Sequence, residues 1–473
     1  MSRGAALPPG DDVLSVRNGR LFVEDVNVCD VAQAYGTPLY VFSERQLRLN
    51  IARWVAAAAQ AWPHGPTLVM PSLKANTSPA LRAILNEEGA GCDVFGPGEL
   101  EIALRALVPA GRISLNGATK SDVLLERAIR AGVAVTLDSA DEFERARRVA
   151  KSLGQVARVR FRIRPWLPST SAVSDFDPTS GAAYLAIQDY RAGMPADEVV
   201  DCLPTAVNDD HLDLVGVHAH ASRQTTDLSF WAAYGREIGT TCAELARLSP
   251  GWRPREIDLG GGFAVPRDPT GRPYPHNPGL APTPAEYLAA ITTGLVLGLA
   301  TGGLTAGGIV LQVEPGRAIY GNTGLHLTRV LHVKRQEQPL PRTWIETDTS
   351  EAFLGDTIVE RNAWTTVLAD EPDRAERMHA AVTGISCGFD VLVPAKDQPR
   401  VTVGEILAIL DTGAYQDTTA NNFNAMARPA TVLVSDNRVS LIKRRETIDD
   451  ITARDVSLDT ARETAREPAQ PLR

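Results

Sequence analysis

Several residues of this 473-residue sequence stand at or just after the ends of short apolar, β-branched segments, where they could act together. Lys74 is one of them, and an amine held in a buried site is suited to form a Schiff base with a carbonyl group. Gly260–Gly262 leave three consecutive backbone N–H groups without Cβ hindrance, which suits anion binding. Glu314 follows the last such segment with a carboxylate. The full set is Lys74, Asp93, Asn116, Asp138, Arg164, His218, His220, Gly260–Gly262 and Glu314.

His218 and His220 stand two residues apart at the end of one predicted strand, so both side chains point to the same face of it. Such a pair is also typical of metal-dependent barrel hydrolases. A metal site needs further histidines or carboxylates grouped with the pair, and the other histidines fall in predicted helices, in loops or in the later part of the chain. We therefore predict no metal ion, while a packing role for one of the two rings stays open.

Eight apolar segments precede these residues and alternate with helical patterns. The segments are Thr67–Leu73, Gly91–Phe95, Arg112–Leu115, Val133–Leu137, Ala157–Ile163, Leu212–His218, Glu256–Leu259 and Ile309–Val313. Helices are predicted near 78–89, 98–108, 121–131, 140–153, 195–203, 228–248 and 284–299. Eight strands that alternate with helices over about 250 residues predict an α/β fold, a (β/α)8 barrel of the TIM type, with an open doubly wound sheet as the competing architecture. In a barrel the polar residues would meet at one mouth, because all of them follow the carboxyl ends of parallel strands.

The chain on either side of the predicted barrel has a different pattern. Strand-like segments dominate after residue 320, at 324–333, 343–348, 380–386, 406–411, 430–434 and 439–443. They predict a C-terminal β-rich domain, a β-sandwich or barrel, over 319–444, which strands of the N-terminal segment 1–42 would join. The barrel domain then spans 43–318, and the charged residues 445–473, which lack an apolar face, form a tail.

Composition excludes several classes of protein. The net charge is −9, from 48 basic and 57 acidic side chains, so the chain lacks the basic excess of a nucleic-acid-binding protein. No uninterrupted apolar stretch is long enough to span a membrane, and the start of the sequence does not read as a secretory signal. The five cysteines are scattered and form no CxxC motif, which argues against disulfides and structural zinc. We expect a cytoplasmic protein.

Taken in chain order, a series of motifs resembles the fold-type III, alanine-racemase-like decarboxylases, which use pyridoxal 5'-phosphate (PLP) and include the diaminopimelate, ornithine and arginine decarboxylases. The resemblance runs from about Pro38 to Val434. It implies a PLP-binding barrel followed by a β-domain, in agreement with the pattern above. The motifs are Leu73-Lys74-Ala75-Asn76, Gly91-Cys92-Asp93 with Gly98-Glu99, Asn116-Gly117 before Lys120, Val217-His218-Ala219-His220, Asp258-Leu259-Gly260-Gly261-Gly262, Glu314-Pro315-Gly316-Arg317, Cys387 and Asp411-Thr412-Gly413-Ala414-Tyr415.

The resemblance assigns a role to each matching residue of the cofactor site. Lys74 would hold PLP as a Schiff base, and Asp93 with Glu99 would orient that amine. Glu314 would pair with the pyridine nitrogen and keep it protonated, which makes the ring an electron sink. His220 would stack on the ring face. The phosphate would be held by Ser222, Gly260, Gly261, Gly262, Arg317 and Tyr415, with an arginine pairing through Arg223 as the alternative to Ser222.

The same resemblance implies how the substrate is handled. Cys387 would reprotonate the α-carbon from the partner subunit, which implies a homodimer with shared active sites. The substrate would be a small amino acid, contacted by Arg164, Arg317 and Asp390.

Departures from the family pattern concern the substrate. Relatives place an acid that reads a distal amine directly after the cysteine, where this chain has Gly388. A buried ammonium without its partner costs about 3–5 kcal/mol. The R-P-x-x-Y segment expected for diaminopimelate is also replaced, by a stretch that contains Glu351. Unless Glu351 or Asp390 substitutes, we expect the substrate to be an atypical amino acid, free or bound to a carrier, and no standard diamino acid.

Two other functions stay open from the sequence. A racemase or epimerase could use the same cofactor, although Glu314 disfavours racemisation, because the alanine racemases place an arginine opposite the pyridine nitrogen. A catalytically silent binding homologue is the second alternative. Lys74, Glu314 and Cys387 argue against it, whereas Arg223 and Gly388 are compatible with it.

Overall fold

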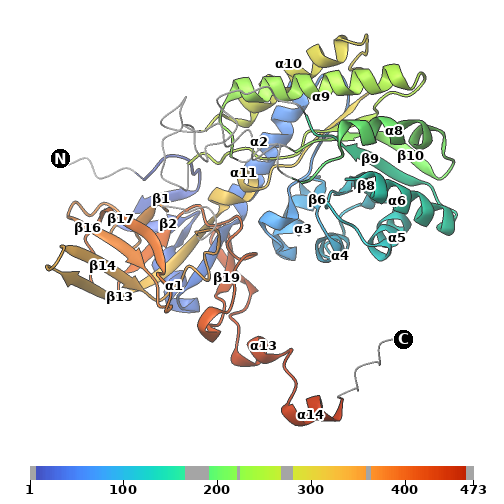
Figure 1. Cartoon of the computed structure of the whole chain (residues 1–473). Helices are drawn as coiled ribbons and strands as arrows, with labels where there is room; N and C mark the ends of the chain where they lie inside the picture. The colour runs from blue at the N-terminus through green and yellow to red at the C-terminus, as the bar shows by residue number, and fades with distance from the viewer. Residues whose placement is uncertain (1–6, 166–190, 221–223, 268–280, 358–363, 465–473) are drawn as a thin grey trace.

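The computed structural model describes residues 7–165, 191–220, 224–267, 281–357 and 364–464 of the chain. Two halves are evident in Figure 1, a strand-and-helix half that holds β5 to β12 and a strand-rich half around β13 to β19. No helix among the described residues is long and apolar enough to cross a membrane.

Eight parallel strands form the first half, in the order β5-β12-β11-β10-β9-β8-β7-β6. An isolated parallel bridge between Ser72 and Asp93 joins the two outer strands, so the sheet is nearly closed. The predicted barrel is therefore confirmed, and the open doubly wound sheet is wrong. The strands are β5 (Thr67–Val69), β6 (Cys92–Val94), β7 (Ile113–Leu115), β8 (Ala134–Leu137), β9 (Ala157–Arg162), β10 (Leu212–His218), β11 (Glu256–Asp258) and β12 (Val310–Val313).

Helices cover the outside of the barrel. Apart from α2 (Glu44–Ala61), each overlaps a predicted range, and α8 (Ala196–Asn208) ends five residues beyond its own. They are α2 (Glu44–Ala61), α3 (Pro79–Glu87), α4 (Pro97–Arg105), α5 (Asp122–Ala131), α6 (Ala140–Leu153), α8 (Ala196–Asn208), α9 (Leu228–Leu248) and α10 (Pro284–Ala300). Local signals fix their ends: the Ser43 side chain accepts the N–H of Gln46 at the start of α2, and Gly132 ends α5 with a left-handed backbone. Glycines let α9 and α10 touch, since a Cβ on Gly235 would lie 2.0 Å from the Ile291 carbonyl oxygen.

The second half is a nine-stranded sheet built around one long strand, β13 (Gly324–Gln336). As predicted, the N-terminal segment joins it, because β4 (Leu39–Ser43) pairs with both β13 and β19. The other strands are β14 (Arg342–Thr347), β15 (Thr366–Leu368), β16 (Arg377–Thr383), β17 (Val391–Pro399), β18 (Ile406–Ile409), β19 (Ala430–Ser435) and β20 (Arg438–Lys443). Of these, β15 and β17 were not predicted.

Smaller elements flank the second half. Strands β1 (Leu14–Arg17), β2 (Arg20–Val23) and β3 (Val26–Asn27) form a separate small sheet, followed by α1 (Val28–Tyr35). At the other end, α13 (Ile448–Thr452) and α14 (Leu458–Glu463) bury none of their residues and extend away from the body (Figure 1). Their exposure is what the charged sequence of 445–473 predicts for a tail.

The two halves meet at the turn that carries Lys74. The backbone N–H of Tyr415, from a loop after β18, donates to the Ala75 carbonyl over 2.8 Å. The Asn76 side chain donates in return to the Gly413 carbonyl over 3.1 Å. A short helix, α11 (Arg317–Tyr320), follows the last barrel strand at the same junction. The β-half thus reaches the mouth of the barrel.

Candidate active site

Lys74 lies in a single 3-10 turn, η1 (Leu73–Ala75), just beyond β5. Its Nζ donates to Ser72 Oγ over 2.7 Å and lies 3.3 Å from Asp93 Oδ2. The side chain is 44% exposed, so the amine is open to a ligand. Burial alone would lower the pKa of Lys74. The negative charge of Asp93, with smaller contributions from Glu314 and other groups, outweighs burial and holds the pKa of Lys74 above its usual value. The amine is therefore a cation that needs a proton acceptor before it can act as a nucleophile.

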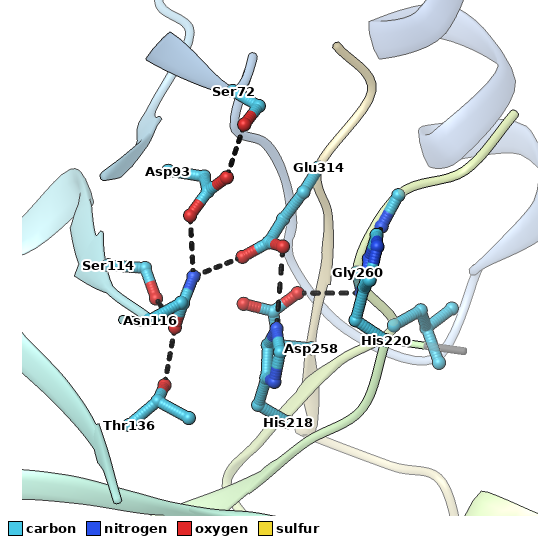
Figure 2. A network of polar contacts seen from close by, with 12 residues as sticks. Ser72, Asp93, Ser114, Asn116, Thr136, His218, His220, Asp258, Gly260 and Glu314 are labelled. Carbon is cyan, nitrogen blue, oxygen red and sulfur yellow. Dashed lines mark hydrogen bonds and ion pairs between the residues drawn. The ribbon is translucent and has the colours of Figure 1, made fainter. Parts of the chain in front are cut away.

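Asp93, at the centre of β6, is the carboxylate nearest to this amine. Burial would raise its pKa, but the charge of Lys74 and the donors Ser72 and Asn116 outweigh burial, and the pKa of Asp93 lies below its usual value. Asn116 links Asp93 to the far side of the site, because its Nδ2 donates to Asp93 Oδ1 over 2.8 Å and also to Glu314 Oε1. Figure 2 shows this continuous chain of polar contacts from Ser72 to Glu314.

Glu314 lies directly after β12, beside His218 and Asp258. His218 Nε2 is 3.4 Å from Glu314 Oε2. Burial, and then the charge of Asp93, raises the pKa of Glu314 to about 8; burial, and then the charge of Glu314, raises the pKa of Asp258 to about 7. Burial also lowers the pKa of His218 to about 3, so this imidazole is neutral. Two carboxyl groups with raised pKa values side by side form a site that attracts a proton or a protonated ring nitrogen.

This cluster also tests the metal interpretation. Ligand atoms of His218, Asp258 and Glu314 lie within 4.8 Å of one another. A guanidinium already compensates its charge, because Arg160 Nη1 donates to Asp258 Oδ2 over 2.9 Å. His220 does not join the cluster, since its Nδ1 accepts the Gly261 N–H over 3.0 Å. The two histidines of the predicted pair therefore lie in different surroundings: His218 beside the Glu314 carboxylate, and His220 against the glycine turn.

The glycine turn after β11 brings His220 against the barrel. Gly260 has a φ of +65°, and a Cβ there would lie 2.4 Å from the Ala219 carbonyl oxygen. Its N–H donates to Asp258 Oδ1 over 3.1 Å, while the Gly261 N–H goes to His220. The three free N–H groups expected from the sequence are therefore not all free. The turn fixes the His220 ring instead, and burial followed by the charge of Lys74 keeps the pKa of His220 well below its usual value.

Arg317, at the start of α11, offers an unused donor for an anion. Its Nη2 donates to Asp356 Oδ2 over 2.8 Å, and its guanidinium lies 4.7 Å from the centre of the Tyr415 ring. Its Nη1 is buried and has no hydrogen-bond partner among the described residues. A buried guanidinium N–H without an acceptor is costly, and a phosphate or carboxylate oxygen would satisfy it.

Three other predicted residues are placed less centrally. Glu99 is half-buried and accepts the Phe95 N–H over 2.8 Å, and burial followed by the charge of Asp93 raises its pKa. Arg164 lies beyond the end of β9 with an exposed side chain. Two residues earlier, buried Arg162 lies inside the barrel, with Nη1 3.4 Å from Asp138 Oδ1. Ser222, with its alternative Arg223, lies outside the described residues.

Cys387 belongs to the β-half, in the loop between β16 and β17, and is exposed. Asn424 brackets it: its Oδ1 accepts the Cys387 N–H over 3.0 Å, and its Nδ2 lies 3.3 Å from the Cys387 sulfur. Apolar neighbours are exposed as well, above all Phe389, at 98%. This thiol is open to solvent in a single chain.

The same loop shows what stands near Gly388. A Cβ at this position would lie 3.2 Å from Glu351 Oε1, so the Glu351 carboxylate borders the space that the glycine leaves. Asp390 is only 2% exposed, and its oxygens accept the N–H groups of Glu351 and Ser386, each over 2.6 Å. Asp390 therefore fixes the backbone of the loop, whereas Glu351 is half-buried beside Gly388.

Sequence reasoning missed Ser72 and left Asn116, His218 and Asp258 out of the final site. Asn116, His218 and Asp258 do stand at the ends of predicted barrel strands, which was a usable signal. Ser72 gave a weaker one, as the residue two positions before Lys74. Arg160 gave none, because a charged residue within an apolar strand segment does not reveal that it faces the barrel interior.

Comparisons with known proteins agree with this geometry. The family described as "Pyridoxal-dependent decarboxylase, pyridoxal binding domain" matches residues 48–321. The diaminopimelate decarboxylase of Methanocaldococcus jannaschii is 29% identical over 456 residues, covering 94% of this chain and 97% of that protein. That of Pseudomonas aeruginosa is 31% identical over 449 residues, covering 93% and 98%. The crystal structure of the M. jannaschii enzyme in complex with L-lysine has a TM-score of 0.84 at 28% identity, over 95% of this chain and 99% of that chain.

The resemblance inferred from the motifs is thereby confirmed, since the family match alone covers more than half of the chain. The site also fits the cofactor on its own terms: an accessible lysine, a buried carboxyl pair that attracts a proton, and an arginine N–H without an acceptor. The enzyme uses PLP and acts on a small amino-acid substrate. The chain belongs to the pyridoxal-dependent decarboxylases of fold type III.

Proposed function

We propose that the enzyme removes the α-carboxylate of an amino acid that carries a second, distal ammonium group, in a site completed by a second copy of the chain. PLP, when bound, is the electron sink for the carbanion left when CO2 departs. The substrate part of this proposal rests on the position of the Glu351 carboxylate, which borders the space left by the missing side chain at Gly388.

The barrel residues bind and orient the cofactor. Lys74 supplies the amine, and Asp93, 3.3 Å from its Nζ, orients it. Glu314 holds a proton at the ring nitrogen, where its raised pKa and the neighbouring Asp258 favour one. Neutral His220, fixed by the Gly261 N–H, covers the face of the ring and excludes water.

The phosphate binds at the junction of the two halves. The unpartnered Nη1 of Arg317 supports this assignment, and Tyr415 lies under the same guanidinium. The glycine turn is the other phosphate-binding element of the proposal; its backbone keeps its course because a side chain at Gly260 would clash with the Ala219 carbonyl and the His220 ring.

Cys387 donates the proton that replaces CO2 on the α-carbon. Its exposure in one chain, together with the exposed ring of Phe389, supports a homodimer in which this loop enters the partner's active site. Glu351 would then enter beside the thiol.

The substrate proposal differs from the expectation that Gly388 excludes standard diamino acids. That expectation required that no other acid replace the missing one, and Glu351 stands where it is needed. Burial, and then the charge of Asp390, raises the pKa of Glu351, so this carboxylate gains from a cation beside it. Diaminopimelate, the substrate named for the relatives, is the first compound to test.

The test is CO2 release by the PLP-loaded enzyme on a panel of L- and D-amino acids, with diaminopimelate, lysine, ornithine, arginine and glutamate. We expect release with a diamino acid, and none after Lys74→Ala. Glu351→Gln should raise KM for that substrate about tenfold and change kcat little, because it removes one charge-assisted contact.

Glu376→Gln is the matched control, since Glu376 is an exposed carboxylate of the same half. Release from glutamate alone, or an unchanged KM in Glu351→Gln, would overturn the substrate assignment. If the wild-type enzyme releases no CO2 from any compound of the panel, the proposed decarboxylation is wrong.

A further inference from the structure

Asn116 uses every polar atom of its side chain inside the barrel. Its amide nitrogen donates to the carboxylates of Asp93 and Glu314 (Figure 2). Its carbonyl oxygen accepts two hydroxyl protons, from Ser114 over 2.8 Å and from Thr136 over 2.5 Å. The residue is 5% exposed and lies directly after β7.

The two hydroxyls fix which way the amide faces. Arg160 Nη2 donates to Ser114 Oγ, and because a guanidinium only donates, the Ser114 proton is left for Asn116. A flipped amide would set its NH2 against these hydroxyl donors and its oxygen against two carboxylates. The nitrogen therefore has to face Asp93 and Glu314.

This orientation matters because the two carboxylates are buried like charges. Asp93 is 3% exposed and Glu314 is 5% exposed. Each disfavours the ionised form of the other, and a shared N–H donor offsets that repulsion. One carboxylate belongs to the Lys74 side of the site, and the other lies beside His218 and Asp258.

We propose that Asn116 is a positioning residue that holds Asp93 and Glu314 at one fixed spacing and so links the two ends of the cofactor site. The inference rests on the proposed function, in which Lys74 and Glu314 serve opposite ends of PLP. Asn116 acts through the two carboxylates, so its loss should change both the affinity for PLP and the pH titration of the bound cofactor.

The experiment uses the PLP-loaded enzyme and two readouts other than turnover: the Kd for PLP and the pH titration of the visible absorbance of the bound cofactor. Other charges contribute to this titration, and the variants leave them unchanged. The titratable and charged groups that interact with one or both carboxylates are Lys74, Cys92, Glu99, Arg160, His218, His220, Tyr234 and Asp258.

Asn116→Leu, which keeps the size and removes the donor, should weaken PLP binding about tenfold or more. It should also move the absorbance midpoint to higher pH, because carboxylates that lose a donor bind protons more tightly. A Kd and a midpoint equal to those of the wild type would overturn the proposal.

If Asn116→Leu does not fold, Thr136→Val decides, since it leaves Asn116 and the contact between Arg160 and Ser114 in place and removes one of the two hydroxyl donors that orient the amide. We expect shifts in the same directions, and unchanged values would overturn the proposal. Thr292→Val is the matched control, because its buried hydroxyl bonds only within α10, to the Leu288 carbonyl. The proposed function fails separately, if Lys74→Ala leaves the wild-type cofactor absorbance unchanged.

Discussion

At the barrel mouth, Glu314, Asp258 and His218 are at most 5% exposed and lie in one continuous polar network, whereas the loop that carries Cys387 exposes its thiol, and Phe389 is 98% exposed. The residues of the first region all belong to one chain, and its two carboxyl groups with raised pKa values attract a proton. The second is organised, with Asp390 holding its backbone, but nothing among the described residues covers it. In the proposed function, each chain alone builds the cofactor site, and a second copy completes the substrate side.

Glu314→Gln should have the largest effect, because it neutralises the carboxylate at the centre of the complete region. We expect CO2 release per bound PLP to fall by about 100- to 1,000-fold, a size typical for loss of one preorganised electrostatic contact. Rapid-quench measurement of a single turnover gives the rate of the chemical step. A rate within threefold of wild type would show that the barrel network is structural only.

Mixing two inactive variants tests whether the exposed region completes a partner's site. Lys74→Ala and Cys387→Ser should each lower activity by about 100-fold or more. Refolded together at equal amounts, they should recover up to about one quarter of the wild-type activity, since half of the dimers are hybrids and each hybrid holds one intact site. No recovery above the two parents would place Cys387 in the site of its own chain.

The smallest expected effect is on stability. The free energy of unfolding should depend on pH through the buried carboxyl groups of the barrel and not through the exposed loop. Glu314 and Asp258 have folded-state pKa values of about 8 and 7, above their values of 4.5 and 3.8 in an unfolded chain. Between pH 6.5 and 8 these two groups thus hold more protons in the folded PLP-free protein than in the unfolded chain, and their contribution to the free energy of unfolding falls as pH rises; the buried neutral rings of His218 and His220 contribute in the opposite direction near pH 6.5.

Urea unfolding of the PLP-free protein at pH 6.5 and 8 measures this fall. Glu314→Gln should make the fall smaller, and Glu351→Gln, in the exposed region, should leave it nearly unchanged. Equal slopes for wild type and Glu314→Gln would contradict the raised pKa of Glu314.

The barrel was predictable because its eight strands are short apolar segments with regular spacing, and every one lies inside its predicted range or matches it. In the β-half, β17 escaped prediction because Lys396-Asp397-Gln398-Pro399 interrupts its apolar alternation, and β15 because it has only three residues. Both are recognisable only from the strands beside them, β16 and β18.

The site was predictable where a motif carries a residue, as for Lys74, His220 and Glu314. It was not predictable where long-range packing decides. Glu351 is 37 positions from Gly388 in sequence, and only the folded loops bring its carboxylate there. Arg160 in turn looks like a surface charge until the barrel closes around it and Asp258.

The two hydrogen bonds between the Lys74 turn and the Tyr415 loop have one further consequence, for assembly. They form only when the barrel and the β-half are both folded and docked, because each bond takes one group from either half. Arg317 likewise places its guanidinium over Tyr415. With the phosphate bound at this junction, as proposed, binding of PLP and docking of the halves are thermodynamically linked: PLP then stabilises the docked arrangement, and a chain whose halves have come apart binds PLP less tightly.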